Sequence, residues 1–273
     1  MDHNERPPDW LWLRRAILVA GVLAPLFALL MIRHDVIIAL TPLFLSHVAL
    51  LYPTLNPHSQ WWGPVVRSFA TDKKEVWLTI DDGPSASTTQ MLDILDRFHA
   101  KATFFAVGKR IASRENMLRD IGHRGHQLGN HTFTHPSAYF WCSPPAAIRR
   151  EISRCADVLP DGIRQVMRAP VGIKNFYLHP VLAELGFQCI GWTARGFDTL
   201  FRNPSRVARR IAGKLAPGAI ILLHERDLHG VRGDFHTRCL EAVLQEVTDA
   251  GYRCVVPSAE QFRAKAPARS RRR

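Results

Sequence analysis

Hydrophobic and polar positions divide the chain into two unlike parts, the first of which is almost continuously apolar. Residues 16–32 and 36–52 form two apolar runs that are separated only by Arg33, His34 and Asp35. At 1.5 Å per helical residue each run is about 25 Å long, which is the lower limit for crossing a bilayer. Pro residues interrupt both runs, as membrane helices tolerate. The pattern therefore predicts one or two N-terminal membrane helices.

Three arrangements of these runs stay open: a membrane hairpin, a single signal anchor followed by an interfacial run, and a cleaved signal peptide. No small-residue cleavage site supports the last. Arg6, Arg14 and Arg15 place the N-terminus in the cytoplasm by the positive-inside rule. We favour the hairpin, although Arg33 in its turn weighs slightly against it. In a bacterial-type inner (plasma) membrane it would return the main domain to the cytoplasmic face, whereas a single span would place that domain in the periplasm or outside.

From residue 72 short apolar strands alternate with amphipathic helices about seven times. This predicts an α/β fold with a parallel sheet covered by helices, either a barrel or a doubly wound sheet. Strands are expected at 76–81, 102–107, 126–130, 165–168, 187–192, 219–224 and 252–256, and helices at 87–99, 111–121, 146–159, 178–185, 204–215 and 235–250.

The domain organisation follows from these changes in pattern. We expect a polar N-terminal segment (1–15), membrane-anchoring segments (16–52), a linker (53–71), one α/β domain (72–260) and a basic tail (261–273). The linker contains Trp61 and Trp62, which suit either a membrane interface or the core of the domain.

Composition and charge narrow the function classes. The chain has 273 residues, 47% of them hydrophobic, and a net charge of +12 from 36 basic and 24 acidic residues. The basic tail would suit an anionic lipid surface or nucleic acid, but no recognition helix or interleaved aromatic pattern accompanies it, so nucleic acid is not an expected partner. The five cysteines form no Cys-x-x-Cys pair, which disfavours a zinc knuckle and a thioredoxin-like site.

The candidate chemistry begins at Asp81 and Asp82, which end the first predicted strand before a Gly-Pro turn. Neighbouring strand residues point to opposite faces, but at a strand end the second can swing round. The pair could then supply one general base and one metal ligand, although Asp-Asp-Gly-Pro is also ordinary turn chemistry. His131 and His135, four residues apart, can reach the same metal ion. Two His and one carboxylate are typical of hydrolytic metal sites that activate water.

Three further residues follow later strands or loops. Arg168 could pair with the base Asp81 and orient it. His224 ends an apolar strand, where it could act as general acid for an amine leaving group, and Asp198 could hold its tautomer and raise its pKa. Each of these residues alone has an ordinary surface or structural explanation.

Five segments in order resemble the motifs of the NodB-type polysaccharide deacetylases, carbohydrate esterase family four. They are Thr79–Pro84, His131–His135, Arg168–Gly172, Trp192–Asp198 and Leu222–His224. The resemblance covers residues 70 to 260. It implies a distorted (β/α) barrel, a divalent metal ion such as zinc on Asp82, His131 and His135, a base at Asp81 and an acid at His224.

The fourth motif departs from the family pattern at Arg195, where an Asp is frequent, and at Thr199, where a Trp is frequent. A wall of the groove could therefore be missing. An added positive charge near the cleft would suit an anionic substrate, such as a phosphate-bearing lipid-linked sugar.

These observations predict a membrane-anchored, metal-dependent hydrolase of non-peptide amide bonds. It would remove an N-acetyl or formyl group from an amino sugar, with Asp81 as base for the attacking water. The substrate is expected to be an N-acylated amino-sugar polymer or a lipid-linked saccharide. A rival is an exported peptidoglycan deacylase, and a rival of another class is a non-catalytic membrane scaffold or sugar-binding module on the same fold.

Overall fold

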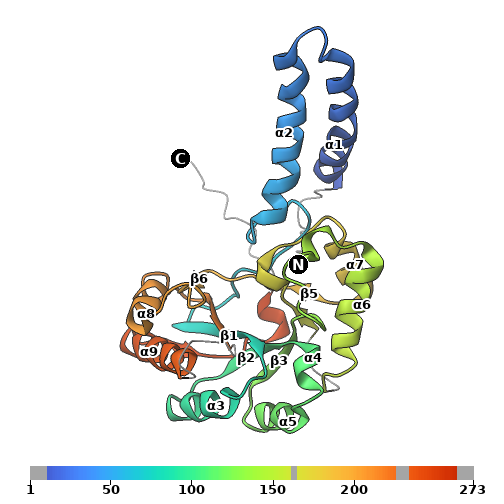
Figure 1. Cartoon of the computed structure of the whole chain (residues 1–273). Helices are drawn as coiled ribbons and strands as arrows, with labels where there is room; N and C mark the ends of the chain where they lie inside the picture. The colour runs from blue at the N-terminus through green and yellow to red at the C-terminus, as the bar shows by residue number, and fades with distance from the viewer. Residues whose placement is uncertain (1–10, 161–164, 226–233, 263–273) are drawn as a thin grey trace, which may run out of the picture.

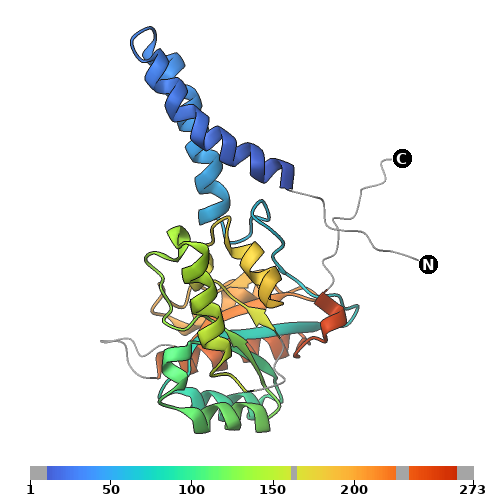
Figure 2. The same ribbon diagram turned by 90° about the vertical axis from the view of Figure 1, so that its right-hand side faces the viewer.

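The computed structural model describes residues 11–160, 165–225 and 234–262. Within them a long helical hairpin stands on an α/β domain (Figures 1 and 2). Most of the expected polar N-terminal segment and all but the first two residues of the expected basic tail lie outside the described residues.

The hairpin consists of α1 (Leu11–Met31) and α2 (Val36–Leu55), which pack side by side in opposite directions (Figure 1). Asp35 caps α2, because its Oδ1 accepts hydrogen bonds from the backbone N–H of Ile37 (2.8 Å) and Ile38 (3.0 Å). The apolar side chains face outward, and Ile37 is 77% exposed. By length and composition both helices are candidates for crossing a membrane.

The domain is built on an eight-stranded sheet whose strand pairs are all parallel. Seven strands run in the order β5-β4-β3-β2-β1-β7-β6, and β8 pairs with β1. The order ends at β5 and β6, so the sheet is a curved half-barrel, as the family resemblance implied. The strands are β1 (Glu75–Gly83), β2 (Ala102–Ala106), β3 (Gln127–Asn130), β4 (Val166–Met167), β5 (Gln188–Cys189), β6 (Ala194–Arg195), β7 (Ile220–His224) and β8 (Arg253–Cys254).

Helices surround this sheet and bury its apolar side chains (Figure 1). Leu78 and Ile80 of β1 are fully buried, which explains why the central strand reads as a continuous apolar run. The α-helices are α3 (Thr88–Arg97), α4 (Gly108–Ile111), α5 (Glu115–His123), α6 (Pro145–Ala156), α7 (Leu178–Leu185), α8 (Pro204–Ala212) and α9 (Phe235–Asp249), and the short 3₁₀ helices are η1 (Phe140–Cys142), η2 (Pro170–Gly172) and η3 (Ala259–Phe262).

The sequence pattern was wrong about one helix and missed one strand. The helix expected at 111–121 is two helices, α4 and α5, because the start of α4 is tied to a neighbouring loop. The backbone N–H of Gly108 donates to the carbonyl of Thr132 (3.0 Å), and that of Lys109 to Phe133 (2.7 Å). The unexpected strand is β6, which is too short to leave a hydrophobic pattern.

The residues expected to link the two parts are packed against the domain. Trp62 is 2% exposed and Phe69 is 4% exposed, so Trp62 is a core aromatic residue. Val66 bridges to Ile190 after β5, and Ser68 bridges to Ala219 before β7. This segment therefore lies between the two sides of the half-barrel and fixes the lower end of α2 to the domain.

Candidate active site

The central strand β1 delivers two carboxylates to the same cavity. Asp81 continues the ladder, in register with Phe105 of β2 and His224 of β7. The register then shifts, and Asp82 adopts a positive φ of 73°. This bulge turns the second carboxylate to the side of the first, as the sequence predicted. Both side chains are buried, so neither is a solvated turn residue.

Two histidines from the loop after β3 meet Asp82. Its Oδ1 lies 3.2 Å from Nε2 of His135 and 3.5 Å from Nε2 of His131. One ligand atom from each of the three residues lies within 4.8 Å of the others. The loop is tight rather than helical, with positive φ at Thr132 and His135. The structure thus brings together the three predicted metal ligands.

The tautomer of His131 suits metal binding. Its Nδ1 lies 2.8 Å from the carbonyl oxygen of Arg168, which can only accept, so Nδ1 carries the proton and donates. In the neutral ring Nε2 then has its lone pair directed toward Asp82. In metal-bound histidines, a hydrogen bond from the ring nitrogen that does not bind the metal fixes the orientation of the ring. The donor set of one carboxylate and two imidazoles therefore fits a divalent cation.

Electrostatics keep Asp82 ionised. Burial raises the pKa of this carboxyl, but the hydrogen bond and charge of His131, with the charges of His135 and His224, outweigh burial and hold the pKa well below its usual range. A carboxylate ligand must be deprotonated, as Asp82 is here, and a bound cation would take the place of the imidazole protons that supply this positive charge.

Arg168 holds the other carboxylate. Its Nη1 donates to Oδ1 of Asp81 and to Oγ1 of Thr79, both at 2.7 Å. Nη2 and Nε donate to the carbonyls of Gly191 (2.8 Å) and Ile190 (3.3 Å). The Arg168 side chain is 1% exposed and each of its guanidinium nitrogens donates a hydrogen bond, so the group is fixed in place and holds the Asp81 carboxylate in one orientation.

His224 and Asp198 form a second buried pair. Nδ1 of His224 lies 2.9 Å from Oδ1 of Asp198, whose Oδ2 accepts from the backbone N–H of His224 at 2.7 Å. Burial lowers the pKa of His224, but the Asp198 carboxylate more than compensates and raises it above its ordinary value. For Asp198, burial raises the pKa and the contacts with His224 reverse this, so the net shift is downward.

Known proteins are similar to this chain in sequence and in fold. A family profile described as polysaccharide deacetylase matches residues 69–190. Over these residues the chain resembles the polysaccharide deacetylase family, and the fold agrees with this resemblance. The family and the enzyme class predicted from the five motifs, a deacetylase-like hydrolase of non-peptide amide bonds, are thereby confirmed. The profile ends before Asp198 and His224, so it does not cover the second buried pair.

The relatives of this chain are named for two kinds of acetylated saccharide, chitooligosaccharide and peptidoglycan. A chitooligosaccharide deacetylase of Bradyrhizobium sp. (strain ANU 289) is 28% identical over 193 residues, which are 69% of this chain and 85% of that protein. The peptidoglycan-N-acetylglucosamine deacetylase PgdA of Listeria monocytogenes serotype 1/2a (strain 10403S) is 30% identical over 190 residues, 68% of this chain but 38% of that protein. The crystal structure of the Bc1960 peptidoglycan N-acetylglucosamine deacetylase superposes with a TM-score of 0.62 at 27% identity, covering 69% of this chain and 88% of that one.

Most of the predicted site residues line one cavity of about 70 Å³. Both Asp81 and Asp82, both histidines of the loop, and His224 contribute to it directly. Arg168 and Asp198 do not line the cavity themselves. Each contacts a residue that does: Arg168 contacts Asp81, and Asp198 contacts His224. Trp192, Arg195 and Thr199 of the divergent fourth motif complete the wall.

Sequence reasoning missed Glu225, which supports the Asp-Asp-Gly-Pro turn. This fully buried carboxylate accepts from the backbone N–H of Ser85 (2.8 Å) and from the hydroxyl of Thr88. A Cβ on Gly83 would lie 2.6 Å from its Oε2, so the turn needs glycine there. Its position next to His224 was the only sequence signal.

Proposed function

We propose that this chain is a membrane-anchored, metal-dependent hydrolase that removes an N-acetyl or N-formyl group from an amino sugar. One observation carries the proposal: a single buried cavity joins a carboxylate held by arginine, an Asp-His-His cluster and a histidine held by aspartate. That combination supplies a base, a cation site and an acid within one site for amide hydrolysis.

Asp82, His131 and His135 are the proposed ligands of a divalent cation, for which we choose zinc because two imidazoles and one carboxylate suit it. A cation at such a site supplies Lewis-acid chemistry, lowering the pKa of water and polarising a carbonyl oxygen. Relatives named as deacetylases of acetylated amino sugars support the same reaction class.

Asp81 is the proposed general base. Its Oδ1 is occupied by Arg168, whereas Oδ2 faces the histidine cluster, 3.8 Å from Nε2 of His131. Oδ2 is therefore the atom placed to take a proton from water as that water attacks the amide carbonyl carbon. Arg168 keeps the carboxylate oriented while it accepts this proton.

His224 is the proposed general acid. Its Nδ1–H is directed to Asp198, which leaves Nε2 for the reacting groups, and its raised pKa favours the protonated ring near neutral pH. As the carbon–nitrogen bond breaks, His224 donates a proton to the leaving nitrogen. The products are a free amino sugar and acetic or formic acid, so one water molecule is consumed.

The hairpin supports membrane anchoring. The first residues of α1 and the last residues of α2 lie at the same end, against the domain, and Arg14 donates to the carbonyl of Phe176. If both helices cross the membrane, the domain shares a side with the N-terminus. The basic residues before and within α1 then place the catalytic domain on the cytoplasmic face.

The deciding experiment measures divalent-metal content and the release of acetate or formate from N-acylated amino sugars. Asp81→Asn should retain metal and lose activity about a thousandfold, since a general base contributes 10²- to 10⁴-fold. His131→Ala should lose both. Exposed residues supply matched controls, Asp157→Asn and His123→Ala, which should behave as wild type. Metal-free protein that releases neither acid would instead support a non-catalytic sugar-binding role.

A further inference from the structure

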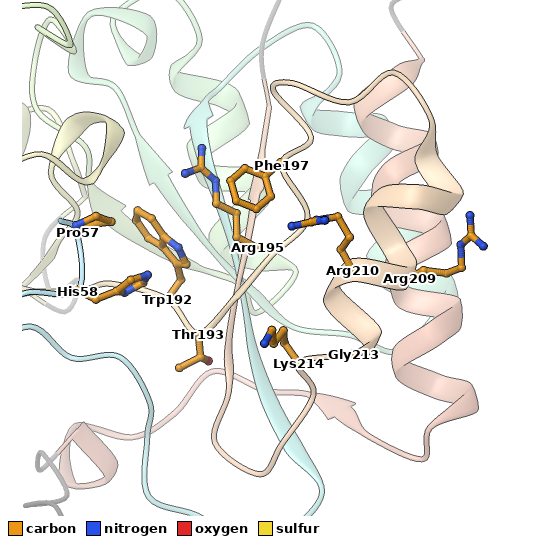
Figure 3. A pocket seen from close by; sticks show the side chains of 10 residues that line it. All are labelled: Pro57, His58, Trp192, Thr193, Arg195, Phe197, Arg209, Arg210, Gly213 and Lys214. Atoms are coloured by element: carbon orange, nitrogen blue, oxygen red, sulfur yellow. The ribbon is translucent and has the colours of Figure 1, made fainter. Parts of the chain in front are cut away.

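A second cleft, of about 600 Å³, adjoins the catalytic cavity (Figure 3). The two share Trp192 and Arg195, so a ligand can extend from one into the other. Pro57 and His58, just below α2, form one wall, and the C-terminal end of α8 forms the opposite wall. We call this space the basic cleft.

Only cationic, neutral polar and apolar side chains line the basic cleft within the described part of the chain. Arg195, Arg210 and Lys214 contribute charge without an Asp or Glu among the lining residues. Both guanidinium groups lie against the ring of Phe197, at 4.8 Å for Arg195 and 4.9 Å for Arg210. Figure 3 shows Arg210 directed from α8 toward Phe197 and Arg195, whereas Arg209 points away from them.

The end of a helix does not by itself explain this arrangement. Cations in the last turn of α8 interact favourably with its dipole, but Arg195 and His58 come from other segments. Nε of Arg195 is buried and has no hydrogen-bond partner among the described residues. Two converging guanidinium groups and a lysine repel one another, and an anion between them would relieve that cost.

A separate apolar groove lies along the hairpin and shares no lining residue with the basic cleft. Val48, Leu51, Tyr52 and Leu55 of α2 line a hollow of about 380 Å³ that ends at Asn56, the residue before Pro57. Each of the four side chains is at least 45% exposed. The lining of the apolar groove thus ends at Asn56 and that of the basic cleft begins at Pro57, and the groove lies on the segment that we assign to the membrane.

We propose, building on the deacylase function above, that the substrate is an N-acylated amino sugar joined through phosphate to a long hydrocarbon chain. The sugar occupies the catalytic cavity, the phosphate binds Arg195, Arg210 and Lys214, and the first part of the hydrocarbon chain lies along α2. Arginine forks match phosphate oxygens bidentately, and α2 offers the apolar surface that a lipid needs. A neutral polysaccharide would use neither feature.

Three probes separate the parts of this proposal in the detergent-solubilised, metal-loaded full chain. They are polyprenyl-phosphate-linked N-acetylglucosamine, soluble N-acetylglucosamine 1-phosphate, and the octyl glycoside of N-acetylglucosamine, which has a chain but no phosphate. The double variant Arg210→Gln/Lys214→Gln is compared with Arg206→Gln. Arg206 is the matched control because it also lies on α8 and stacks on an aromatic ring, that of Phe201 at 4.1 Å, yet does not line the cleft.

The double variant should raise KM for the polyprenyl-phosphate probe about tenfold, since charge-assisted hydrogen bonds are lost from an exposed cleft. The preference for this probe over the octyl glycoside should fall by the same factor and should also fall with added salt. Arg206→Gln should change neither. An unchanged KM in the double variant would refute the phosphate site, and equal KM values for the lipid-linked and soluble phosphates would refute the lipid part.

Failure of the proposed deacylase function can be distinguished from failure of the proposed phosphate site. If no probe releases acetate, equilibrium binding of the polyprenyl-phosphate probe to the Asp81→Asn protein still tests the basic cleft. Weaker binding after Arg210→Gln/Lys214→Gln would support the cleft as a phosphate site, and unchanged binding would reject it. Acetate release from all probes at similar kcat/KM would keep the deacylase function and overturn the lipid-phosphate substrate.

Discussion

The catalytic cavity and the basic cleft share a wall but are built in opposite ways. In the catalytic cavity each buried charge has a partner: Asp81 with Arg168, and Asp198 with His224. In the basic cleft the cations are exposed or half-buried and have no acidic partner among the lining residues. The catalytic cavity has a volume of about 70 Å³ and the basic cleft a volume of about 600 Å³.

This difference suits the catalytic cavity to the reaction itself and the basic cleft to substrate recognition. Reacting groups need fixed positions, and the ends of parallel strands in a packed sheet provide them. Recognition of a flexible, charged substrate needs reachable groups, and α8 and the segment after α2 provide those. Changes in the catalytic cavity should therefore cost stability and turnover, whereas changes in the basic cleft should mainly alter KM.

The largest effect is expected from Arg168→Met. The variant leaves the buried Asp81 carboxylate without its cation and removes four hydrogen bonds from the guanidinium group. Breaking a buried ion pair in this way costs about 3–5 kcal/mol, which urea unfolding would measure. Arg149→Met is the control, because Arg149 pairs with Glu184 at the surface, where solvent screens the pair, and its loss should change the free energy of unfolding little. Equal losses would show that Arg168 is not the support of the site.

Asp198→Asn should reduce turnover about a hundredfold with little change in fold, because the acid His224 loses the charge that holds its protonated form. Asp198 raises the pKa of His224, so its neutralisation lowers that pKa. The alkaline limb of the kcat/KM profile should then move to lower pH. Asp157→Asn, an exposed carboxylate, serves as control. An alkaline limb that stays in place would exclude His224 as the titrating acid.

The sequence predicted most of the buried cavity because its residues end apolar strands. Asp81 lies two residues before the end of β1 and His224 closes β7, and both strands stand out as apolar runs in the amino-acid sequence. Parallel strand ends meet at one edge, so placing these residues together needed no contact information. The two-residue strand β6 and the break between α4 and α5 left no such signal, since each depends on hydrogen bonds to distant segments.

The basic cleft was only partly predictable for the same reason. Arg195 could be singled out as a departure within a motif, and it does line the cleft. His58 and Lys214 could not, because they belong to an aperiodic segment and to the end of a surface helix. The packing of Pro57 and Trp192 against Gly172, together with the hydrogen bonds from Lys174 to the carbonyls of Asn56 and Pro57, brings the segment after α2 to the active site.

Gly172→Ala tests the wall between the two spaces. Gly172 has a φ of +74°, and a Cβ there would lie 2.5 Å from Cη2 of Trp192 and 2.7 Å from Cβ of Pro57. The backbone strain and the overlap together should cost about 2 kcal/mol in the free energy of unfolding. We also expect a higher KM for the polyprenyl-phosphate probe, because Trp192 lines both spaces.

The control for this wall is Gly122→Ala in α5. No atom lies within 4 Å of a Cβ added there, so the variant should be neutral or slightly stabilising. If the Gly172→Ala protein were as stable as the Gly122→Ala protein, the wall between the two spaces would be able to adjust to the added methyl group. The contrast between a rigid catalytic cavity and an adaptable basic cleft would then be weaker.

The smallest effect is expected from Lys174, which lies beneath the basic cleft. Its Nζ donates to the carbonyls of Asn56 (2.9 Å) and Pro57 (3.1 Å), and burial lowers its pKa from 10.5 to about 8. Between these values the unfolded chain binds more protons than the folded one, so stability rises with pH. From pH 7 to pH 9 the gain should be about 1 kcal/mol. Lys174→Met should abolish this gain in the free energy of unfolding, as measured by urea titrations. Lys109→Met, at an exposed lysine, should preserve the gain. If the gain persisted in Lys174→Met, the titration of Lys174 would not be its cause.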